Sequence, residues 1–449
     1  MVKSYKLHKF FGVSAGLVIL LLSITGFLLD HDKWDFLYTT TFRTYPDSIA
    51  NADKRLFSSY LISEQNPQHI FAASKRGLYE SLDGGEHFKK TSSLQINAMQ
   101  QSKNELILAT SDGIYIKNTQ GIEPFLLKDN YITALSFEKG VLAAVVDKKD
   151  IYLIDVEHKK IMKKLQVILP AALLQEDIKL SRFVRDLHYG RGFFDGILSL
   201  YFNDFAALIL IFLAGSGFVI WYFIYQKKVA KSARKWIRYH ANLFTVVAIL
   251  PVLFLAVTGV FLDHSSGLRK FMKSVTISNT FLPPVYHALT EDIWSVDYDG
   301  KRLRIGNRYG VYGSDDLKKW QLESRGFAYS LSHYKSKIYV GGMGSANRVY
   351  EAGRWALLKH TPHMFKTVFV KDGDIKFFAR SKRDILLPRF QDITLYSLVL
   401  SLHDGSFFAS WWRWVDDYAA IAMIVLFFSG IIRWWRKAHL LTFSLEKKR

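Results

Sequence analysis

The stretch LHKFFGVSAGLVILLLSITGFLLDH, from Leu7 to His31, returns later in the chain as YHANLFTVVAILPVLFLAVTGVFLDH, from Tyr239 to His264. Both copies open on a histidine, continue as an apolar run and close on Thr-Gly followed by Asp-His. Each run approaches the ~20 residues that an α-helix needs to cross a hydrocarbon core of ~30 Å. The two copies therefore predict two membrane-spanning helices with a histidine at each end.

A second pair of stretches is duplicated in the same way. LHYGRGFF (187–194) and NDFAALILIFLAGSGFVIWY (203–222) return as LHDGSFF (402–408) and DDYAAIAMIVLFFSGIIRWW (416–435). The chain is thus a tandem repeat of a two-helix unit. It predicts four spans, at roughly residues 10–29, 205–225, 241–262 and 418–435.

The net charge of +20 reflects membrane topology. Lysine and arginine gather in three clusters, within residues 3–9, 227–238 and 433–449. Because such clusters stay on the cytoplasmic side, both termini are expected inside and two long loops outside. The topology favours lipid contact over nucleic-acid binding, which is the competing interpretation of a basic chain. The first span looks like a signal peptide, but it is too long and offers no small-x-small cleavage site, so we expect a retained anchor.

The chain has no cysteine. Disulfides, covalently attached c-type haem, iron–sulfur clusters and thiolate zinc sites are therefore excluded. Any metal must be held by nitrogen or oxygen ligands.

The two long loops are predicted to be rich in β-strands. The first repeats at a period of about 36 residues, through HIFAASKRGLYESLDGG, ELILATSDGIYIKNTQG and VLAAVVDKKDIYLIDVEHKK, and the second holds weaker counterparts. Short-strand repeats of this length are typical of propeller blades. Three blades cannot close a ring, so we expect both loops to form one cap of about six blades. Within it, Ser81–Phe88 (SLDGGEHF) resembles an Asp-box turn with a structural role.

The predicted fold class is an α+β membrane protein, with a four-helix transmembrane bundle and β-rich, propeller-like periplasmic loops. We expect the chain to run in this order: a first span with a cytoplasmic N-terminus (1–32), a first periplasmic domain (33–186), a second span (187–226), a cytoplasmic loop (227–239), a third span (240–265), a second periplasmic domain (266–400), a fourth span (401–437) and a cytoplasmic tail (438–449).

Six histidines recur in three corresponding pairs: His8 with His240, His31 with His264, and His188 with His403. Histidine ligates metals as a neutral group. In a pseudo-two-fold bundle the first pair would meet at the cytoplasmic side and the other four residues at the outer side. Opposed imidazoles on neighbouring helices hold b-type haem in bundle cores. The alternative is that these histidines anchor the helix ends at the headgroups. Small residues in the spans would leave room for a flat macrocycle: Gly12, Gly16, Gly26, Gly215, Gly217, Gly259 and Gly430.

The outer pairing stays open at this point. We expect one outer haem held across the repeat, by His188 with His403 or by His31 with His264, whereas pairing within a repeat would give two. Asp204 and Asp417, which also match, are expected to cap the helices that follow them. Basic residues of the second loop would draw an anionic acceptor toward the site: Lys301, Arg302, Arg304, Arg308, Lys318 and Lys319.

The LH-x-G motif before a span, the TG-x-x-x-DH ending and the D-x-AA opening followed by SG-x-x-x-W resemble the PepSY-associated transmembrane family. The resemblance covers the four spans and their flanks. It implies a bacterial inner-membrane ferric-siderophore reductase with two b-type haems, for which the matching histidines are the candidate axial ligands: His8, His240, His188, His403, His31 and His264. The departure is that neither loop shows a PepSY fold.

The histidine pattern and the resemblance together predict an inner-membrane b-type diheme oxidoreductase that transfers electrons across the membrane to a periplasmic acceptor, a ferric siderophore, in iron uptake. The alternative is a non-enzymatic, membrane-anchored propeller that binds a partner, signals or acts as a scaffold; a third reading is a metal or haem carrier. Because no G-x-G-x-x-G fingerprint follows a strand, electrons would come from a membrane quinol or a separate reductase.

Overall fold

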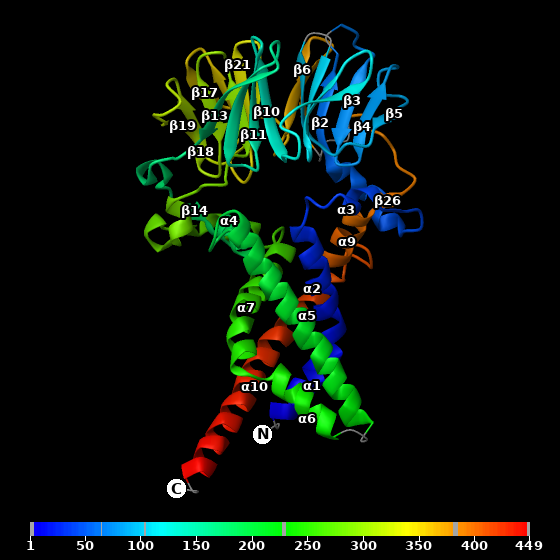
Figure 1. The fold of residues 1–449 in the computed structure, drawn as a ribbon, viewed down its shortest axis with the longest axis vertical. Helices are drawn as coiled ribbons and strands as arrows, with labels where there is room; N and C mark the ends of the chain where they lie inside the picture. The colour runs from blue at the N-terminus through cyan, green and yellow to red at the C-terminus, as the bar shows by residue number, and fades with distance from the viewer. Residues whose placement is uncertain (1–3, 64, 103–104, 227–229, 380–384, 447–449) are drawn as a thin grey trace.

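The protein consists of a bundle of helices below a ring of β-sheets (Figure 1). This is a computed structural model that describes residues 4–63, 65–102, 105–226, 230–379 and 385–446. Parts of the three basic clusters, at residues 3, 227–229 and 447–449, lie outside the described residues.

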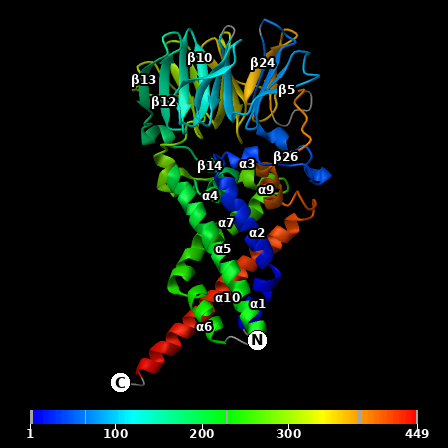
Figure 2. The ribbon, with the colours of Figure 1, turned by 45° about the vertical axis from the view of Figure 1, so that its right-hand side comes forward.

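The bundle is built from matching helices of the two repeats. α1 (Ser4–Ser14) and α2 (Gly16–Asp30) form a bent pair in the first repeat, followed by α5 (Ile197–Tyr225); α7 (Leu243–Asp263) and α10 (Arg413–Glu446) belong to the second. α2 packs on α5, and α10 packs on α1 and α7 and then extends away from the other helices (Figure 2). Alanine dominates the shared core, which allows close helix contact: Ala15, Ile19, Ala206, Val252, Ala256, Ala419, Ala420, Ala422 and Met423.

Two helices are long and apolar enough to cross a membrane, namely α5 and the Arg413–Trp435 part of α10. The α1–α2 pair, bent by 56°, would make a third if it is one span. In α7 the apolar stretch Ala248–Asp263 is shorter than a membrane span. Of the four predicted spans, the described residues thus supply two, or three with the bent pair, and a span through α7 stays a prediction.

Short helices carry three of the matched histidines at their last residue. They are α4 (Leu180–His188), α6 (Ala230–His240) and α9 (Leu395–His403). After α4 and α9 the chain turns through Gly190 at φ +70° and Gly405 at φ +73°. A Cβ would stand only 2.6 Å from the Ser199 carbonyl oxygen at the first and 2.6 Å from Trp412 Cδ1 at the second. The glycine of the LH-x-G motif is therefore required to end the helix.

Small elements connect the bundle to the sheets and pair the two repeats. β1 of the first repeat pairs with β26 of the second, and β14 pairs with β15 in the same way. The bounds are β1 (Thr41–Phe42), β26 (Ile393–Thr394), β14 (Ile178–Lys179), β15 (Thr276–Ile277), helices α3 (Phe36–Thr39) and α8 (Arg269–Ser274), and 3-10 turns at Asp47–Ile49, Ala52–Leu56, Ala171–Leu174, Asn279–Phe281 and Pro284–His287.

Six antiparallel sheets make up the ring, with strands in chain order within each sheet. Three come from the first loop: β2 (Phe57–Ile62), β3 (Ile70–Ser74), β4 (Gly77–Ser81) and β5 (Lys89–Ser92); β6 (Ile96–Ser102), β7 (Glu105–Thr110), β8 (Gly113–Lys117) and β9 (Ile122–Leu126); β10 (Ile132–Glu138), β11 (Val141–Val146), β12 (Asp150–Asp155) and β13 (Lys160–Gln166). Three come from the second: β16 (Ser295–Tyr298), β17 (Leu303–Gly306), β18 (Gly310–Ser314) and β19 (Gln321–Arg325); β20 (Ala328–Tyr334), β21 (Lys337–Gly342), β22 (Arg348–Glu351) and β23 (Arg354–Leu357); β24 (Thr367–Lys371) and β25 (Asp374–Phe378).

The ring closes because the two loops contact each other at both junctions. β10 packs on β16 at one junction, where the Tyr298 amide donates to Ser136 Oγ at 3.0 Å. β24 packs on β2 at the other, where Lys366 Nζ donates to the Phe57 carbonyl at 3.0 Å. The prediction of one six-bladed propeller built from both loops is confirmed. Each sheet buries both faces against neighbours, which three sheets alone could not do.

The Asp-box turn has the structural role predicted for it. Between β4 and β5, Asp83 Oδ1 accepts from Ser81 Oγ at 2.6 Å and from the His87 amide at 3.0 Å. These hydrogen bonds lower the pKa of the Asp83 carboxyl. Asp316 makes the matching turn between β18 and β19, where it accepts from the amides of Lys318 and Lys319.

A buried arginine fastens the propeller to the bundle. Arg308 follows β17, and its guanidinium lies 2.7 Å from Asp292 and 3.3 Å from Asp186. Asp186 belongs to α4, two residues before His188. Since both carboxylates are buried, Arg308 balances charge that water does not reach.

Replacing Arg308 with Met should strongly destabilise this junction. Asp292 would lose its cation, and Asp186 would keep only Arg182 at 3.5 Å, at a cost of about 3–5 kcal/mol in the free energy of unfolding. Lys337→Met is the matched control, because it removes an exposed ion pair with Glu351 at 2.6 Å and should cost about 0–1 kcal/mol. Denaturant unfolding of the purified protein, followed by tryptophan fluorescence, measures both; equal effects would contradict the assigned role.

Candidate functional site

His8 and His240 meet where α1 and α6 approach each other, at the end of the bundle far from the propeller (Figure 1). Their ring centroids lie 6.2 Å apart and their planes are at 89°. His8 Nδ1 is hydrogen-bonded to Ser429 Oγ on α10 at 2.8 Å. His240 Nδ1 is hydrogen-bonded to Ser216 Oγ on α5 at 2.7 Å. The two histidines are thus fixed by the same contact in each repeat.

His188 and His403 occupy the propeller end of the bundle with the same contact. His188 Nδ1 lies 3.1 Å from Thr258 Oγ1 on α7, and His403 Nδ1 lies 2.9 Å from Thr25 Oγ1 on α2. Both rings line one cavity and lie close enough for the charge of one to affect the other. Of the pairings left open by the sequence, the structure brings this pair together.

A glycine follows each of these four hydroxyl residues and lies against the ring of the bound histidine. A side chain at that position would meet the imidazole edge, so glycine keeps the space beside the ring open. A Cβ would stand 3.6 Å from His8 Cε1 at Gly430, 3.8 Å from His240 at Gly217, 3.6 Å from His188 at Gly259 and 3.4 Å from His403 at Gly26. The other glycines expected to make room serve other contacts: Gly12 faces Leu426 and Gly16 faces Phe218.

All four hydrogen bonds cross from one repeat to the other. The histidine comes from one half of the chain and its hydroxyl partner from the other half. Sequence reasoning missed these hydroxyl partners. The signal was present, because the quoted TG and SG motifs contain all four, but nothing in the sequence says which histidine each one faces.

Burial keeps the outer imidazoles neutral. Burial, and then the nearby His403, lower the pKa of His188 to about 4, and burial also lowers the pKa of His403. Both rings therefore carry no charge at neutral pH. With Nδ1 held by a hydroxyl, Nε2 on the other side of the ring is the nitrogen that a neutral imidazole offers to a metal.

His31 and His264 lie elsewhere and have different partners. His264 Nε2 lies 2.7 Å from Asp417, and His31 Nε2 lies 3.6 Å from Asp204. Neither histidine lines the cavity of the outer pair. The prediction that Asp204 and Asp417 cap the following helices is wrong, since α5 begins at Ile197 and α10 at Arg413. The aspartates instead bind the histidines that end the neighbouring helices.

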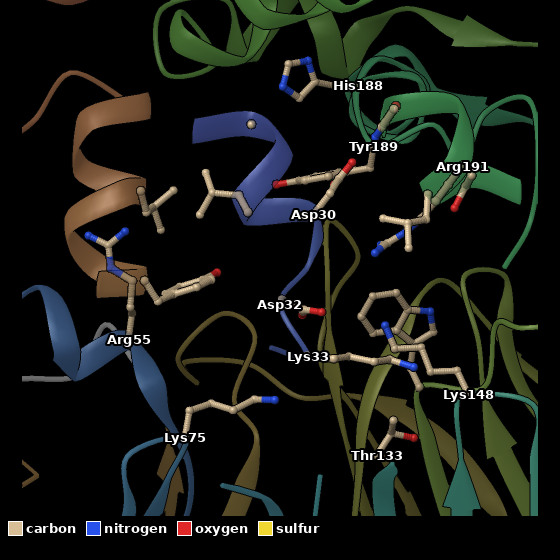
Figure 3. A pocket seen from close by; sticks show the side chains of 18 of the residues that line it. Asp30, Asp32, Lys33, Arg55, Lys75, Thr133, Lys148, His188, Tyr189 and Arg191 are labelled. Atoms are coloured by element: carbon tan, nitrogen blue, oxygen red, sulfur yellow. The ribbon is translucent and has the colours of Figure 1, made fainter. Parts of the chain in front are cut away.

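A cavity of about 1390 Å³ separates the outer histidine pair from the propeller. Its floor is made by the bundle, and its roof by the innermost strands of the six sheets. Figure 3 shows charged side chains pointing into it from both parts, among them Asp30, Lys33, Lys148 and Arg191. The volume exceeds the ~300–1,000 Å³ of most small-molecule pockets, so a bulky ligand could reach the histidines.

The basic residues predicted to attract an anion are placed differently. Arg302 and Arg304 bind Glu323, and Arg308 binds Asp292. None of the six predicted residues lines the cavity. The prediction is wrong for these positions because Arg302 and Arg304 join strands within the propeller, and Arg308 joins the propeller to α4. Other cations face the cavity instead: Lys33, Arg55, Lys75, Lys148, Lys149, Arg191 and Lys366.

The residues present suit a macrocycle with an iron between two imidazoles. Two metal–imidazole bonds of about 2 Å each, together with the two half-rings, span about 6 Å, which matches the 6.2 Å between the His8 and His240 rings. The glycine beside each ring provides space for a flat group. His8 with His240, and His188 with His403, could therefore each hold one haem, with the hydroxyls orienting the ligands.

The model of the PepSY-associated TM region matches residues 5–437. The chain therefore belongs to the PepSY-associated transmembrane family and is a membrane protein. No curated protein matches the sequence.

Among solved structures, the extracellular domain of a one-component system from B. thetaiotaomicron is similar over 75% of this chain and 32% of its own, with 11% identity and a TM-score of 0.35. The Neurospora crassa Pan2 WD40 domain is similar over 70% of this chain and 68% of its own, with 9% identity and a TM-score of 0.33. The designed Ika8 protein is similar over 71% of this chain and 79% of its own, with 8% identity and a TM-score of 0.33. The chain spans about a third of the length of the first of these proteins.

Replacing Thr25 with Val should loosen His403 while keeping the shape of the side chain. Without its hydroxyl partner the imidazole loses its fixed orientation, and such losses cost about 10–100-fold in affinity for a ligated metal. Haem titration into the purified protein measures this as weaker binding at one site only. Ser23→Ala is the control, because it removes a hydroxyl of the same helix that binds the Ile19 carbonyl. An unchanged titration for Thr25→Val would argue against the orienting role.

Proposed function

We propose that this protein is a membrane oxidoreductase that binds two b-type haems and passes electrons across the membrane to an acceptor in the cavity, a ferric siderophore being the acceptor we put forward. The observation that carries the proposal is the fourfold recurrence of one arrangement. Four imidazoles, in two pairs at two levels of the bundle, each have Nδ1 bound to a hydroxyl and a glycine beside the ring.

The ligand assignment follows from the pairs. His8 and His240 would hold the haem at the cytoplasmic end, and His188 and His403 the one below the cavity. When bound, the two groups would supply one-electron redox chemistry at two depths. The alanine-rich core of the bundle contributes Ile19, Val252, Ala256, Ala420 and Met423 to the lining of the cavity. Ser216, Thr25 and their counterparts would hold each imidazole in one orientation.

We infer four spans in a bacterial inner membrane, with both termini cytoplasmic and the propeller periplasmic. The basic clusters at residues 3–9, 227–238 and 433–449 support this orientation. α7 would supply the third of the four spans: it matches the α1–α2 pair in sequence and packs on α5 and α10.

The donor would be a membrane quinol or a separate reductase. The segment between α5 and α7 holds only α6 and is too short to fold a nucleotide-binding domain. The acceptor would enter the cavity, whose volume of about 1390 Å³ suits a bulky chelate. Oxidation of one quinol to its quinone would release two electrons and two protons, and the two electrons would reduce two ferric ions in turn.

The alternative is a membrane-anchored propeller that binds a partner or acts as a scaffold. That function would account for the ring of sheets but gives no reason for four identically bonded histidines. A haem or metal carrier would use the same histidines without changing oxidation state. A redox spectrum separates the proposals.

Pyridine-haemochrome analysis and a reduced-minus-oxidised spectrum of the purified protein should give two b-type haems per chain. His188→Ala should remove about one equivalent, because one axial ligand of the outer group is lost. His31→Ala should leave both in place, since His31 binds Asp204 and serves as the matched histidine control.

A colourless protein would refute the proposal, and so would loss of haem in His31→Ala with full retention in His188→Ala. Haem that is present but cannot be reduced by quinol or dithionite would favour the carrier.

A further inference from the structure

Two cations share one indole ring where the propeller meets the bundle. Lys148, in the turn between β11 and β12, has its Nζ 3.7 Å from the centre of the Trp294 ring. Arg191, in the turn after α4, has its guanidinium carbon 5.5 Å from the same centre. Both cations line the cavity, and Figure 3 shows Arg191 and Lys148 toward the same edge of the view. Arg191 is three residues from His188 in the sequence.

Neither cation has an acidic partner among the residues that the structure describes. Asp292 binds Arg308, Glu291 binds Lys149, and Asp195 accepts from the amides of residues 290 and 291. Asp30 and Asp32 also line the cavity, and they act on Arg191 and Lys148 through longer-range charge interactions without an ion pair. The two cations thus face an enclosed space, and no carboxylate of the described residues forms an ion pair with either of them. Such an arrangement is costly in a low-dielectric site unless an anion enters it.

We propose that Lys148 and Arg191, on either side of the contact with Trp294, form a carboxylate-binding site in the cavity beside the outer histidine pair. A carboxylate can accept from the planar guanidinium and the ammonium together, and both bonds are charge-assisted. The indole holds the two cations at a fixed position through cation–π contacts. The carboxylate belongs either to a soluble ligand in the cavity or to a haem propionate; the second source rests on the proposed function.

The protonation state of Lys148 should make this site sensitive to pH. Burial, and then Arg191, lower the pKa of Lys148 to about 7, against the opposing effects of Asp32 and Asp292, while Lys33 lowers it further. Lys148 is charged below that pKa and neutral above it. Affinity for an anion should therefore fall as the pH rises from 7 to 8.5, and Lys148→Arg should abolish that fall.

The first arm of the test titrates citrate into the full-length purified protein by calorimetry. Lys148→Met and Arg191→Gln should each weaken binding at least about tenfold, the effect expected for one charge-assisted contact. Lys149→Met is the matched control: the neighbouring lysine also lines the cavity but is paired with Glu291 at 3.5 Å. This arm does not depend on haem.

The second arm measures the midpoint potential and haem retention of the same variants. If the carboxylate is a haem propionate, citrate does not bind the wild type, and Lys148→Met and Arg191→Gln shift the potential or release one haem while Lys149→Met does neither. A wild-type protein without haem would defeat the proposed function and leave the citrate arm to decide.

The site is refuted if the wild type and both variants bind citrate equally. It is also refuted if citrate does not bind and both variants keep the wild-type potential and haem content, or if the wild type binds neither citrate nor haem.

Discussion

The hydrogen bond from a histidine Nδ1 to a hydroxyl of the other repeat is the contact on which the site depends. It occurs four times, with Ser429, Ser216, Thr258 and Thr25 as the partners. Each bond fixes one imidazole and joins the two repeats, so neither half of the chain can form the site alone. The glycine after each hydroxyl residue leaves the edge of the imidazole free of a neighbouring side chain. The same four hydrogen bonds therefore orient the imidazoles and hold the two halves of the bundle together.

The propeller, like the histidine site, needs both repeats in order to form. Three sheets from each loop cannot bury their faces separately, and the ring closes only through contacts between the loops. The small sheets β1–β26 and β14–β15, together with the buried Arg308, connect this ring to α4 and α9, which carry the outer histidines. Closure of the propeller thus positions His188 and His403. It also encloses the cavity between the propeller and these two histidines.

Much of the fold and of the candidate site could be predicted from the sequence, because a residue that recurs at the corresponding position of both repeats is easy to recognise. The repeat identified the helices, the six histidines and the six-bladed ring. It could not separate His188 and His403 from His31 and His264, since all four lie at similar depth in the sequence pattern. Only the packing shows that Asp204 lies against His31 and that Asp417 lies against His264. The basic residues failed for a related reason: composition cannot tell an arginine bound within a sheet, such as Arg304, from a lysine facing a cavity, such as Lys148.

We propose that each of the two pairs of imidazoles binds one haem. The electron paramagnetic resonance spectrum of the oxidised protein at low temperature should reveal this ligation. Axial ligation by two imidazoles gives low-spin ferric haem, and the 89° between the rings of His8 and His240 should give a strongly anisotropic signal for the inner site. We expect two low-spin signals, one of them strongly anisotropic and lost in His8→Ala. A spectrum without low-spin ferric haem, or one that His8→Ala leaves unchanged, would contradict it.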